Sequence, residues 1–182
     1  IVVTINSKGS GMYNNAFISR DLFYEEHGKD AMHIEILDSH TYSYCYGMPV
    51  MWAAQNIQNG MGYEQVRQTL IDHLSRCQAY APIFTLKYAR RSGRISGATA
   101  FVGEMLDFKP VMYVGQGDVT TNIKVRGMAN TLPKAIELVK ENAIDLQNQC
   151  IGIAFGDIDE KFKETIRTRV LDALKPKACF EG

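Results

Sequence analysis

The chain has 182 residues, 46% of them hydrophobic and 22% charged, which is enough to bury a sizeable core in one large domain or two small ones. Its 20 basic residues balance 20 acidic ones, so the net charge gives no general attraction to nucleic acid or to an anionic membrane. No apolar run approaches the roughly 20 residues that a membrane-spanning helix needs.

The cysteines and the first residue bear on the origin of the chain. Four cysteines lie far apart and form no CxxC pair, which favours reduced thiols in a cytoplasmic protein. The chain starts with Ile1 in an apolar run, with neither a methionine nor the charged segment of a signal peptide. These features predict a fragment of a longer protein.

The beginning of the chain predicts a βαβ unit. Residues 1–5 read as a short buried strand, residues 6–11 as a polar turn with glycines, and residues 32–37 as a second strand. The helix between the strands ends at Gly28, and its apolar face is formed by Tyr13, Ala16, Phe17, Phe23 and Tyr24. A strand, a helix and a strand in this order favour a parallel sheet.

Two helices and a short strand are expected next. Residues 47–59 predict a helix, which Gly60 and Gly62 break. The second helix has a buried stripe of Val66, Leu70, Leu74 and Cys77. Beyond Pro82, residues 83–86 predict a strand. We expect the domain boundary between Gly60 and Pro82.

The second half of the chain has a different pattern. A basic loop at residues 90–97 and a short helix at residues 98–106 come first. Strands at residues 111–114 and 119–125 then flank residues 115–118, Gly-Gln-Gly-Asp, which is a sequence typical of a hairpin turn.

The C-terminal part predicts two helices around a strand. The first helix begins near Pro133 and has an apolar stripe of Leu132, Ile136, Val139 and Ala143. A strand follows at residues 150–155. The last helix has apolar residues at every fourth position, namely Phe162, Ile166, Val170 and Leu174. A hairpin, helix, strand and helix favour an α+β layer rather than a second parallel unit.

The polar turn at residues 6–11 is the first candidate site. It follows a strand and opens a helix, and ligands of open parallel sheets bind outside the carboxyl ends of the strands. A helix start offers backbone N–H groups and partial positive charge to a carboxylate or phosphate, and Ser7 and Ser10 add hydroxyl groups. The alternative is that Ser10 only caps the helix.

The same turn permits an enzymatic interpretation. A serine between a strand and a helix is typical of the hydrolase nucleophile elbow G-x-S-x-G, with His40 as the base and Asp38 as its partner. However, Lys8 stands where that motif has its first glycine, and residues 38–40 are equally well explained as a turn with an Asx hydrogen bond. No histidine pair has the helical spacing of metal ligands, so we expect no metal site.

Basic residues in the second half suggest a surface for a partner. Arg90, Arg91 and Arg94 lie in the basic loop, while Lys124 and Arg126 end the second hairpin strand. They are explained either as solvated surface or as a docking surface. Aromatic residues do not alternate with them as in a nucleic-acid platform.

An apolar group follows the basic loop and comprises Ile95, Phe101, Val102, Met105 and Leu106. Its simplest interpretation is ordinary core. Methionine also adapts to irregular apolar shapes, so a lining of a lipid pocket is the alternative.

Five segments carry a family resemblance. Residues 5–13 read I-N-S-K-G-S-G-M-Y, residues 37–39 L-D-S, residues 91–97 R-S-G-R-I-S-G, residues 108–110 F-K-P and residues 124–127 K-V-R-G. In order and spacing they resemble the segments I-S-S-K-L-S-G-T-Y, V-D-S, R-x-G-R-I-S-G, I-K-P and K-V-R-G of the DegV family of fatty-acid-binding proteins.

The resemblance implies an α/β fold class, with a partial parallel-sheet α/β/α domain at residues 1–75 and an α+β two-layer domain at residues 76–182. It further implies that one long-chain fatty acid lies in an apolar tunnel with its carboxylate near the domain junction, and that the protein itself catalyses nothing. Relatives of this kind are the binding subunit of bacterial fatty acid kinase and present the acyl chain to the kinase subunit. No cofactor is implied beyond the bound fatty acid.

Particular residues are expected to form these sites. The fatty-acid-binding residues that we expect are Ser7, Ser10, Gly11, Ile95, Phe101 and Met105. The resemblance implies that Ser10 hydrogen-bonds the carboxylate. The residues that we expect at the kinase surface are Arg90, Arg91 and Arg126.

The chain also departs from the family pattern. Gly9 stands where the family has leucine, and Met12 where it has threonine. The family usually has small residues and aliphatic ones at the positions of Tyr42, Tyr44, Cys45 and Tyr46. The family segments T-S-x-P-S and H-T-G-P-G are absent, so we expect a chain truncated at both ends. A carrier or sensor of another apolar ligand is the alternative function.

Overall fold

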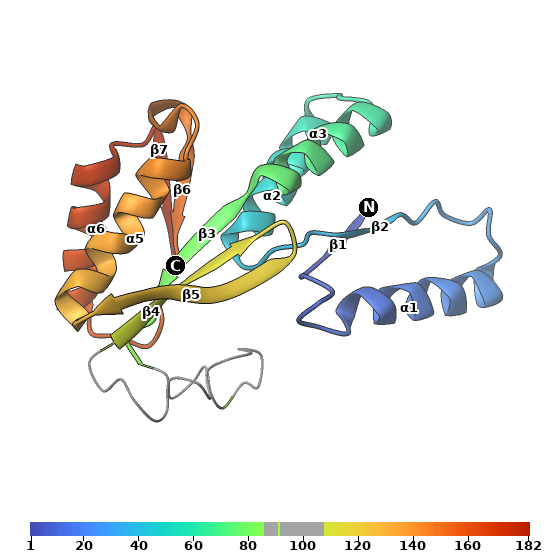
Figure 1. Ribbon diagram of the computed structural model, residues 1–182. Coiled ribbons are helices and arrows are strands. Elements are labelled where there is room, and N and C mark those ends of the chain that lie inside the picture. The colour runs from blue at the N-terminus through green and yellow to red at the C-terminus, as the bar shows by residue number, and fades with distance from the viewer. Residues whose placement is uncertain (86–90, 92–107) are drawn as a thin grey trace. The chain divides into compact units, whose positions relative to one another are not determined.

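The computed structural model describes residues 1–85, 91 and 108–182 (Figure 1). The chain forms two compact units, one made of Ile1–Gln78 with Val114–Asp118 and the other of Ala79–Tyr113 with Val119–Gly182. The hairpin therefore contributes its tip to the first unit and the rest of its strands to the second. The domain limits expected from the sequence, 1–75 and 76–182, stay a prediction.

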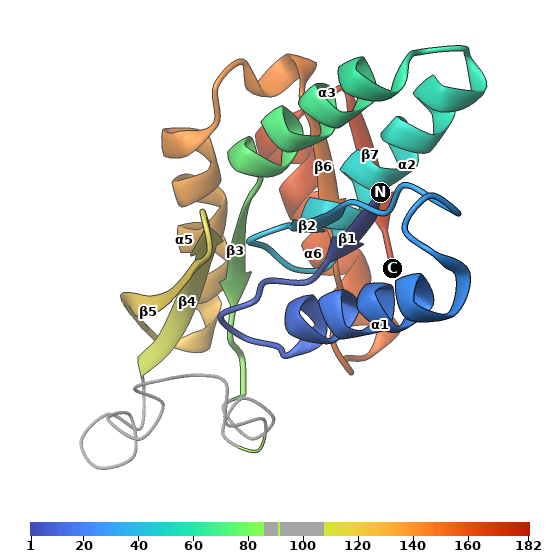
Figure 2. The ribbon, with the colours of Figure 1, turned by 90° about the vertical axis from the view of Figure 1, so that its right-hand side faces the viewer.

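The first unit contains the predicted βαβ arrangement. Strands β1 (Val2–Thr4) and β2 (Ile36–Asp38) pair in parallel, and helix α1 (Met12–His27) connects them. Figures 1 and 2 show α1 on one side of the strand pair, with α2 and α3 on the other. The predicted start of the second strand at residue 32 is wrong. The strand begins at Ile36, which pairs with Val2, the first residue of β1.

Helix α1 follows its sequence pattern closely. The four aromatic residues and the alanine predicted for its inner face are all half-buried. Met12, Ile18 and Leu22 are exposed. The helix ends where predicted, because Gly28 takes a φ of +84°, a backbone conformation that glycine adopts without steric cost.

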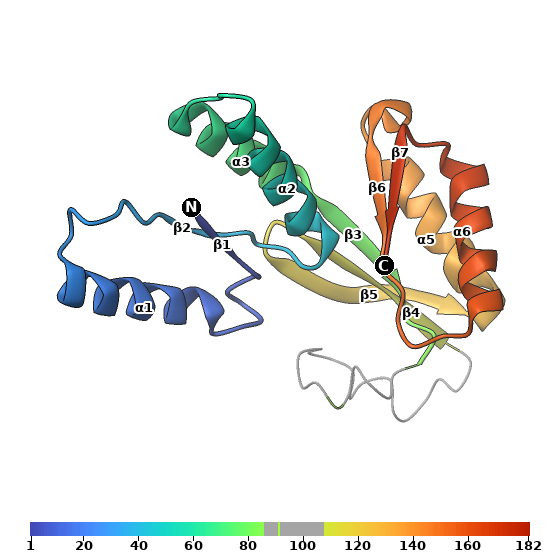
Figure 3. The ribbon, with the colours of Figure 1, turned by 180° about the vertical axis from the view of Figure 1, so that it is seen from behind.

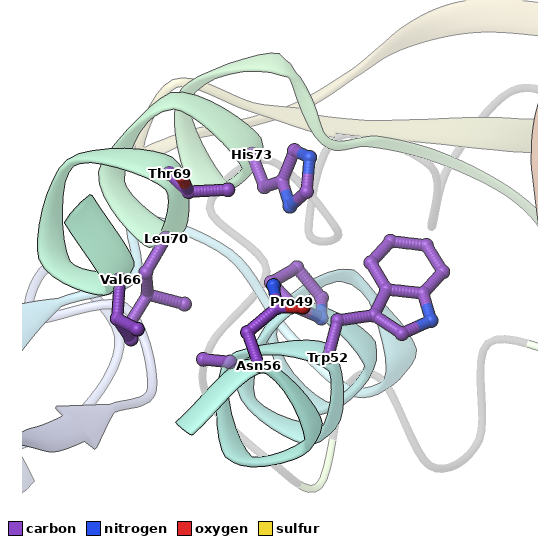
Figure 4. A pocket seen from close by; sticks show the side chains of 8 residues that line it. Pro49, Trp52, Asn56, Val66, Thr69, Leu70 and His73 are labelled. Carbon is purple, nitrogen blue, oxygen red and sulfur yellow. The ribbon is translucent and has the colours of Figure 1, made fainter. Parts of the chain in front are cut away.

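Helices α2 (Tyr44–Gln58) and α3 (Tyr63–Arg76) form an antiparallel pair. The start predicted at Gly47 is wrong, because the Gly47 N–H already bonds to the Ser43 carbonyl at 3.1 Å, as in a regular helix. Figure 4 shows the seam between the helices, which leaves no room for a water-sized molecule. Val66, Leu70 and Leu74 of the predicted stripe of α3 are buried. Cys77, predicted as its fourth member, follows the end of the helix and is half-buried.

The predicted hairpin is confirmed. Strands β4 (Phe108–Gly115) and β5 (Asp118–Arg126) are joined by Gln116 and Gly117, whose φ angles of 51° and 82° suit a tight hairpin turn. Strand β3 (Gln78–Pro82) adds to β4. The strand predicted at residues 83–86 is thus wrong in position, because Pro82 ends the strand rather than preceding it, as proline can at a strand end.

The second unit ends in a parallel unit that the sequence did not reveal. Strands β6 (Cys150–Ile153) and β7 (Ala178–Glu181) pair directly and in parallel. Helix α6 (Glu160–Leu174) connects them along the chain. The expectation that this half holds no second parallel unit is wrong, because the short strand β7 lacks a recognisable pattern. Helix α5 (Met128–Asn142) begins well before Pro133, contrary to prediction, and lies with α6 on one side of the strands (Figure 3).

An apolar cluster packs α5 and α6 against β6 in the second unit. The predicted stripes of α5 and α6 meet β6 in it, and its buried members are Leu132, Ile153, Ile166, Val170 and Leu174. The Asp159 carboxylate accepts a hydrogen bond from the Phe162 N–H at 2.9 Å and so caps α6. Within the described ranges no helix is both long and apolar enough to cross a bilayer. The four cysteines carry free thiols.

Candidate functional site

The candidate site lies at the carboxyl ends of β1 and β2. The loop after β1 carries residues 5–11 and the loop after β2 carries residues 39–43. Backbone hydrogen bonds join them: the Ser39 N–H bonds to the Thr4 carbonyl at 3.0 Å, and the Asn6 N–H to the Thr41 carbonyl at 3.1 Å. Because parallel strands end at the same edge of their sheet, these loops form one rim.

Asn6 fixes this rim from inside. Its side chain is completely buried, its Nδ2 donates to the Gly117 carbonyl at 3.1 Å, and its Oδ1 accepts from the Lys8 N–H at 3.1 Å. The Gly117 N–H in turn donates to the His40 carbonyl at 2.9 Å. The hairpin tip, which belongs to the first unit, is therefore bonded to both loops of the rim.

Asp38 holds the rim from the end of β2. Its carboxylate, only 7% exposed, accepts from the Ser7 N–H at 3.2 Å and from the His40 N–H at 2.9 Å. His40 Nδ1 lies 3.2 Å from the same carboxylate, and the His40 side chain is 59% exposed. The turn with an Asx hydrogen bond, one of the two sequence interpretations of residues 38–40, is thus observed.

Ser10 stands at the entrance to helix α1. Its Oγ accepts a hydrogen bond from the Met12 N–H at 3.2 Å, and Gly11 is the residue that precedes the helix. A serine hydroxyl that accepts in this way keeps its own hydrogen for another acceptor. The first turn of α1 has no acidic residue, so no side chain there offsets the partial positive charge of the helix start. Capping and anion binding by Ser10 are compatible.

The described hydrogen bonds do not form the Ser-His-Asp arrangement of a serine hydrolase. A nucleophile needs a hydrogen bond to its base, and that base needs an orienting partner. His40 has such a partner in Asp38, but in the described part of the chain neither Ser7 nor Ser10 hydrogen-bonds His40. The positive φ of 54° at His40 turns its backbone away from a regular strand conformation.

Two cysteines near the rim are poor nucleophiles. Burial raises the pKa of the Cys45 thiol, and the neighbouring Thr41 side chain partly opposes this rise. Burial raises the pKa of Cys77 to about 12, with a smaller contribution from Cys45. Because the thiolate is the reactive form, both groups stay protonated and inert at neutral pH.

The remaining predicted residues fall in different places. Arg91 is exposed, and Arg126 is exposed at the end of β5, in the second unit. Arg90, Ile95, Phe101 and Met105 lie outside the described residues. Among the residues that can be described, no cluster of His, Cys, Asp and Glu fits a metal ion.

Sequence reasoning missed the roles of Asn6 and Tyr42. Asn6 was only one member of a polar turn, although an amide directly after a buried strand is a signal for a side chain that bonds backbone groups. Tyr42 lies over Gly9, and a Cβ on that glycine would collide with the Tyr42 hydroxyl oxygen. Gly9 and Tyr42, which belong to different loops of the rim, are therefore neighbours in space.

The fold and the rim define an α/β protein whose first parallel strand pair ends in a polar turn. A family model described as "Uncharacterised protein, DegV family" matches residues 1–177 of this chain. A DegV domain-containing protein of Caldanaerobacter subterraneus is 29% identical over 164 residues, which are 90% of this chain and 56% of that protein. The chain belongs to the DegV family.

Solved structures agree with this assignment. The DegV family protein of Ruminococcus gnavus, whose structure carries vaccenic acid, is 25% identical with a TM-score of 0.84 over 100% of this chain and 64% of that one. The Fatty Acid Kinase B3 protein of Streptococcus pneumoniae, loaded with linoleic acid, is 18% identical with a TM-score of 0.78 over 98% of this chain and 62% of that one. The second likeness shows the fold alone. The chain thus spans between about half and two thirds of the length of these relatives.

Proposed function

We propose that the chain belongs to a carrier of one long-chain fatty acid and holds the carboxylate at the turn around Ser10. The observation that carries this proposal is the start of α1, where a serine hydroxyl and a helix N-terminus without acidic residues meet at the carboxyl end of β1. The vaccenic acid in the Ruminococcus gnavus relative supports the ligand class.

The head-group site comprises Ser7, Ser10 and Gly11. No atom lies within 4 Å of an ideal Cβ on Gly11, so the backbone at the helix start is open to a ligand. Taking a carboxylate out of water costs several kcal/mol, and hydroxyl donors together with the helix start offset this cost. These groups therefore mainly set the orientation of the ligand and contribute only a small part of its affinity.

The affinity comes from the tail in an apolar tunnel, to which we assign Ile95, Phe101 and Met105. About 15 buried methylenes at about 0.8 kcal/mol each contribute roughly 12 kcal/mol before the entropy of ordering is subtracted. The vaccenic acid in the Ruminococcus gnavus relative is the reason why we propose a long-chain acid rather than a short carboxylic acid.

The proposed carrier presents its fatty acid to a separate fatty acid kinase subunit and has no catalytic role of its own. The likeness in fold to the Streptococcus pneumoniae Fatty Acid Kinase B3 protein supports this proposal. Arg90, Arg91 and Arg126 are the residues that we assign to the kinase surface. Reversing the charge with Arg126→Glu should lower acyl-phosphate production by the reconstituted kinase without changing fatty acid affinity, and unchanged production would contradict the assignment.

Mass spectrometry of lipid extracted from the purified full-length protein tests the proposed function. We expect one long-chain fatty acid for each protein molecule. A protein that is purified empty and takes up no added oleate would refute the proposal. Uptake of a neutral lipid in place of fatty acid would favour the alternative, a carrier of another apolar ligand.

A further inference from the structure

Gly9 and Tyr42 are complementary in shape. A Cβ on Gly9 would collide with the Tyr42 hydroxyl oxygen and lie 3.2 Å from Tyr42 Cζ, so a side chain at position 9 fits only if the end of the tyrosine ring moves away. Gly9 does not have a positive φ, unlike Gly28, Gly60 and Gly117. The space that the tyrosine occupies, rather than the backbone conformation, therefore favours glycine at this position.

The backbone around Tyr42 is held in place. The Thr41 carbonyl accepts the Asn6 N–H at 3.1 Å, and the Cys45 N–H closes a turn onto the Tyr42 carbonyl at 3.2 Å. Ser43, inside this turn, has φ 52° and ψ −131°, which residues other than glycine rarely adopt. Strain of this kind persists only where the surrounding contacts impose it, and it concentrates at functional sites.

The Tyr42 hydroxyl is placed at the head-group turn. It lies against Gly9, whose next residue along the chain is Ser10. The side chain is half-buried, and within the described residues its hydroxyl makes no hydrogen bond. A phenol fixed in this way is a donor that is already ordered before the ligand arrives, which lowers the entropic cost of the bond.

Resting on the proposed function, we propose that Tyr42 is a specificity-determining residue of the fatty-acid site. Its hydroxyl donates a hydrogen bond to the ligand's carboxylate, and Gly9 provides the space that the ring needs. Position 9 carries no side chain of its own, so the polar group beside this part of the turn comes from the neighbouring loop. Tyr42 thereby favours the ionised acid over neutral lipids.

The test compares oleate with methyl oleate, which has the same tail and no carboxylate, on the full-length protein. Tyr42→Phe keeps the ring and removes only the hydroxyl, so the ratio of oleate to ester affinity should fall about tenfold, as for a lost hydrogen bond to a charged group. Tyr44→Phe, two positions further along, is the matched control and should leave the ratio unchanged. Gly9→Leu should lower the thermal stability of the protein, because the leucine displaces the Tyr42 ring. Adding Tyr42→Val to Gly9→Leu should restore the thermal stability.

The outcomes separate this inference from the proposed function. An unchanged ratio in Tyr42→Phe, with oleate still bound, overturns the head-group role of Tyr42 alone. Failure of the wild-type protein to bind oleate overturns the proposed function and the head-group role with it. A double variant no more stable than Gly9→Leu overturns the complementary pairing.

Discussion

Replacing Asn6 with alanine should loosen the rim on which the site is built. The substitution removes two hydrogen bonds of a completely buried side chain and leaves the Gly117 carbonyl and the Lys8 N–H without these partners. Each bond contributes about 1 kcal/mol, and an abandoned buried group adds to the loss, so we expect a loss of about 2–3 kcal/mol of unfolding free energy.

Urea unfolding followed by tryptophan fluorescence measures this loss. Trp52 is the only tryptophan of the chain and lies in α2, so its signal reports on the first unit. Asn15→Ala is the matched control, because Asn15 is exposed in α1 and alanine is the better helix former. The unfolding midpoints of both variants are compared with that of the wild-type protein at equal slope. If Asn6→Ala lowers the midpoint no more than Asn15→Ala does, the reasoning is refuted.

Other predictions concern ligand binding and pH. Ser10→Ala should weaken oleate binding about threefold to tenfold, whereas Ser19→Ala on the exposed side of α1 should not; equal affinities in a titration would count against the head-group site. Phe101→Glu should abolish binding and spare the fold, and a circular dichroism spectrum of an unfolded chain would instead favour a core role. The hydrogen bond from Tyr63 lowers the pKa of Glu35 in the folded protein, and burial opposes this effect. Ionised Glu35 therefore stabilises the fold above its unfolded pKa near 4.5, and this stability is lost as the pH falls through the lower folded pKa. Thermal unfolding between pH 6 and pH 3 should therefore depend less on pH in Glu35→Gln, and an unchanged dependence would contradict the assignment.

Local patterns predicted much of the fold. The stripes of α3 and α6 are buried as their spacing indicated, since the helical period places every third or fourth residue on one face. The turn at residues 115–118 closes the expected hairpin, because glycine there accepts a positive φ. The polar turn after β1 was also found, since a strand, a turn and a helix leave it at a sheet edge.

Element boundaries were harder to predict. Helix α2 begins before Gly47 and helix α5 before Pro133, although both residues have a weak helix preference. The Gly47 N–H bonds to the Ser43 carbonyl within α2, whereas Pro133 has no N–H and leaves α5 one helical hydrogen bond short. Strand β7 was missed because four residues carry too little pattern, and their pairing with β6 depends on a helix between them. Tertiary pairing decides such elements.

The sequence was sufficient for the class of the fold, the turn that carries Ser10 and the family, because these depend on spacing between residues that are close in the chain. The inner structure of the rim was decided only by tertiary contacts. Asn6 reaches a carbonyl 111 positions away, and Gly9 is explained by a tyrosine from the next loop. Such contacts follow from which strands lie side by side, and a single sequence does not state which distant residues will meet.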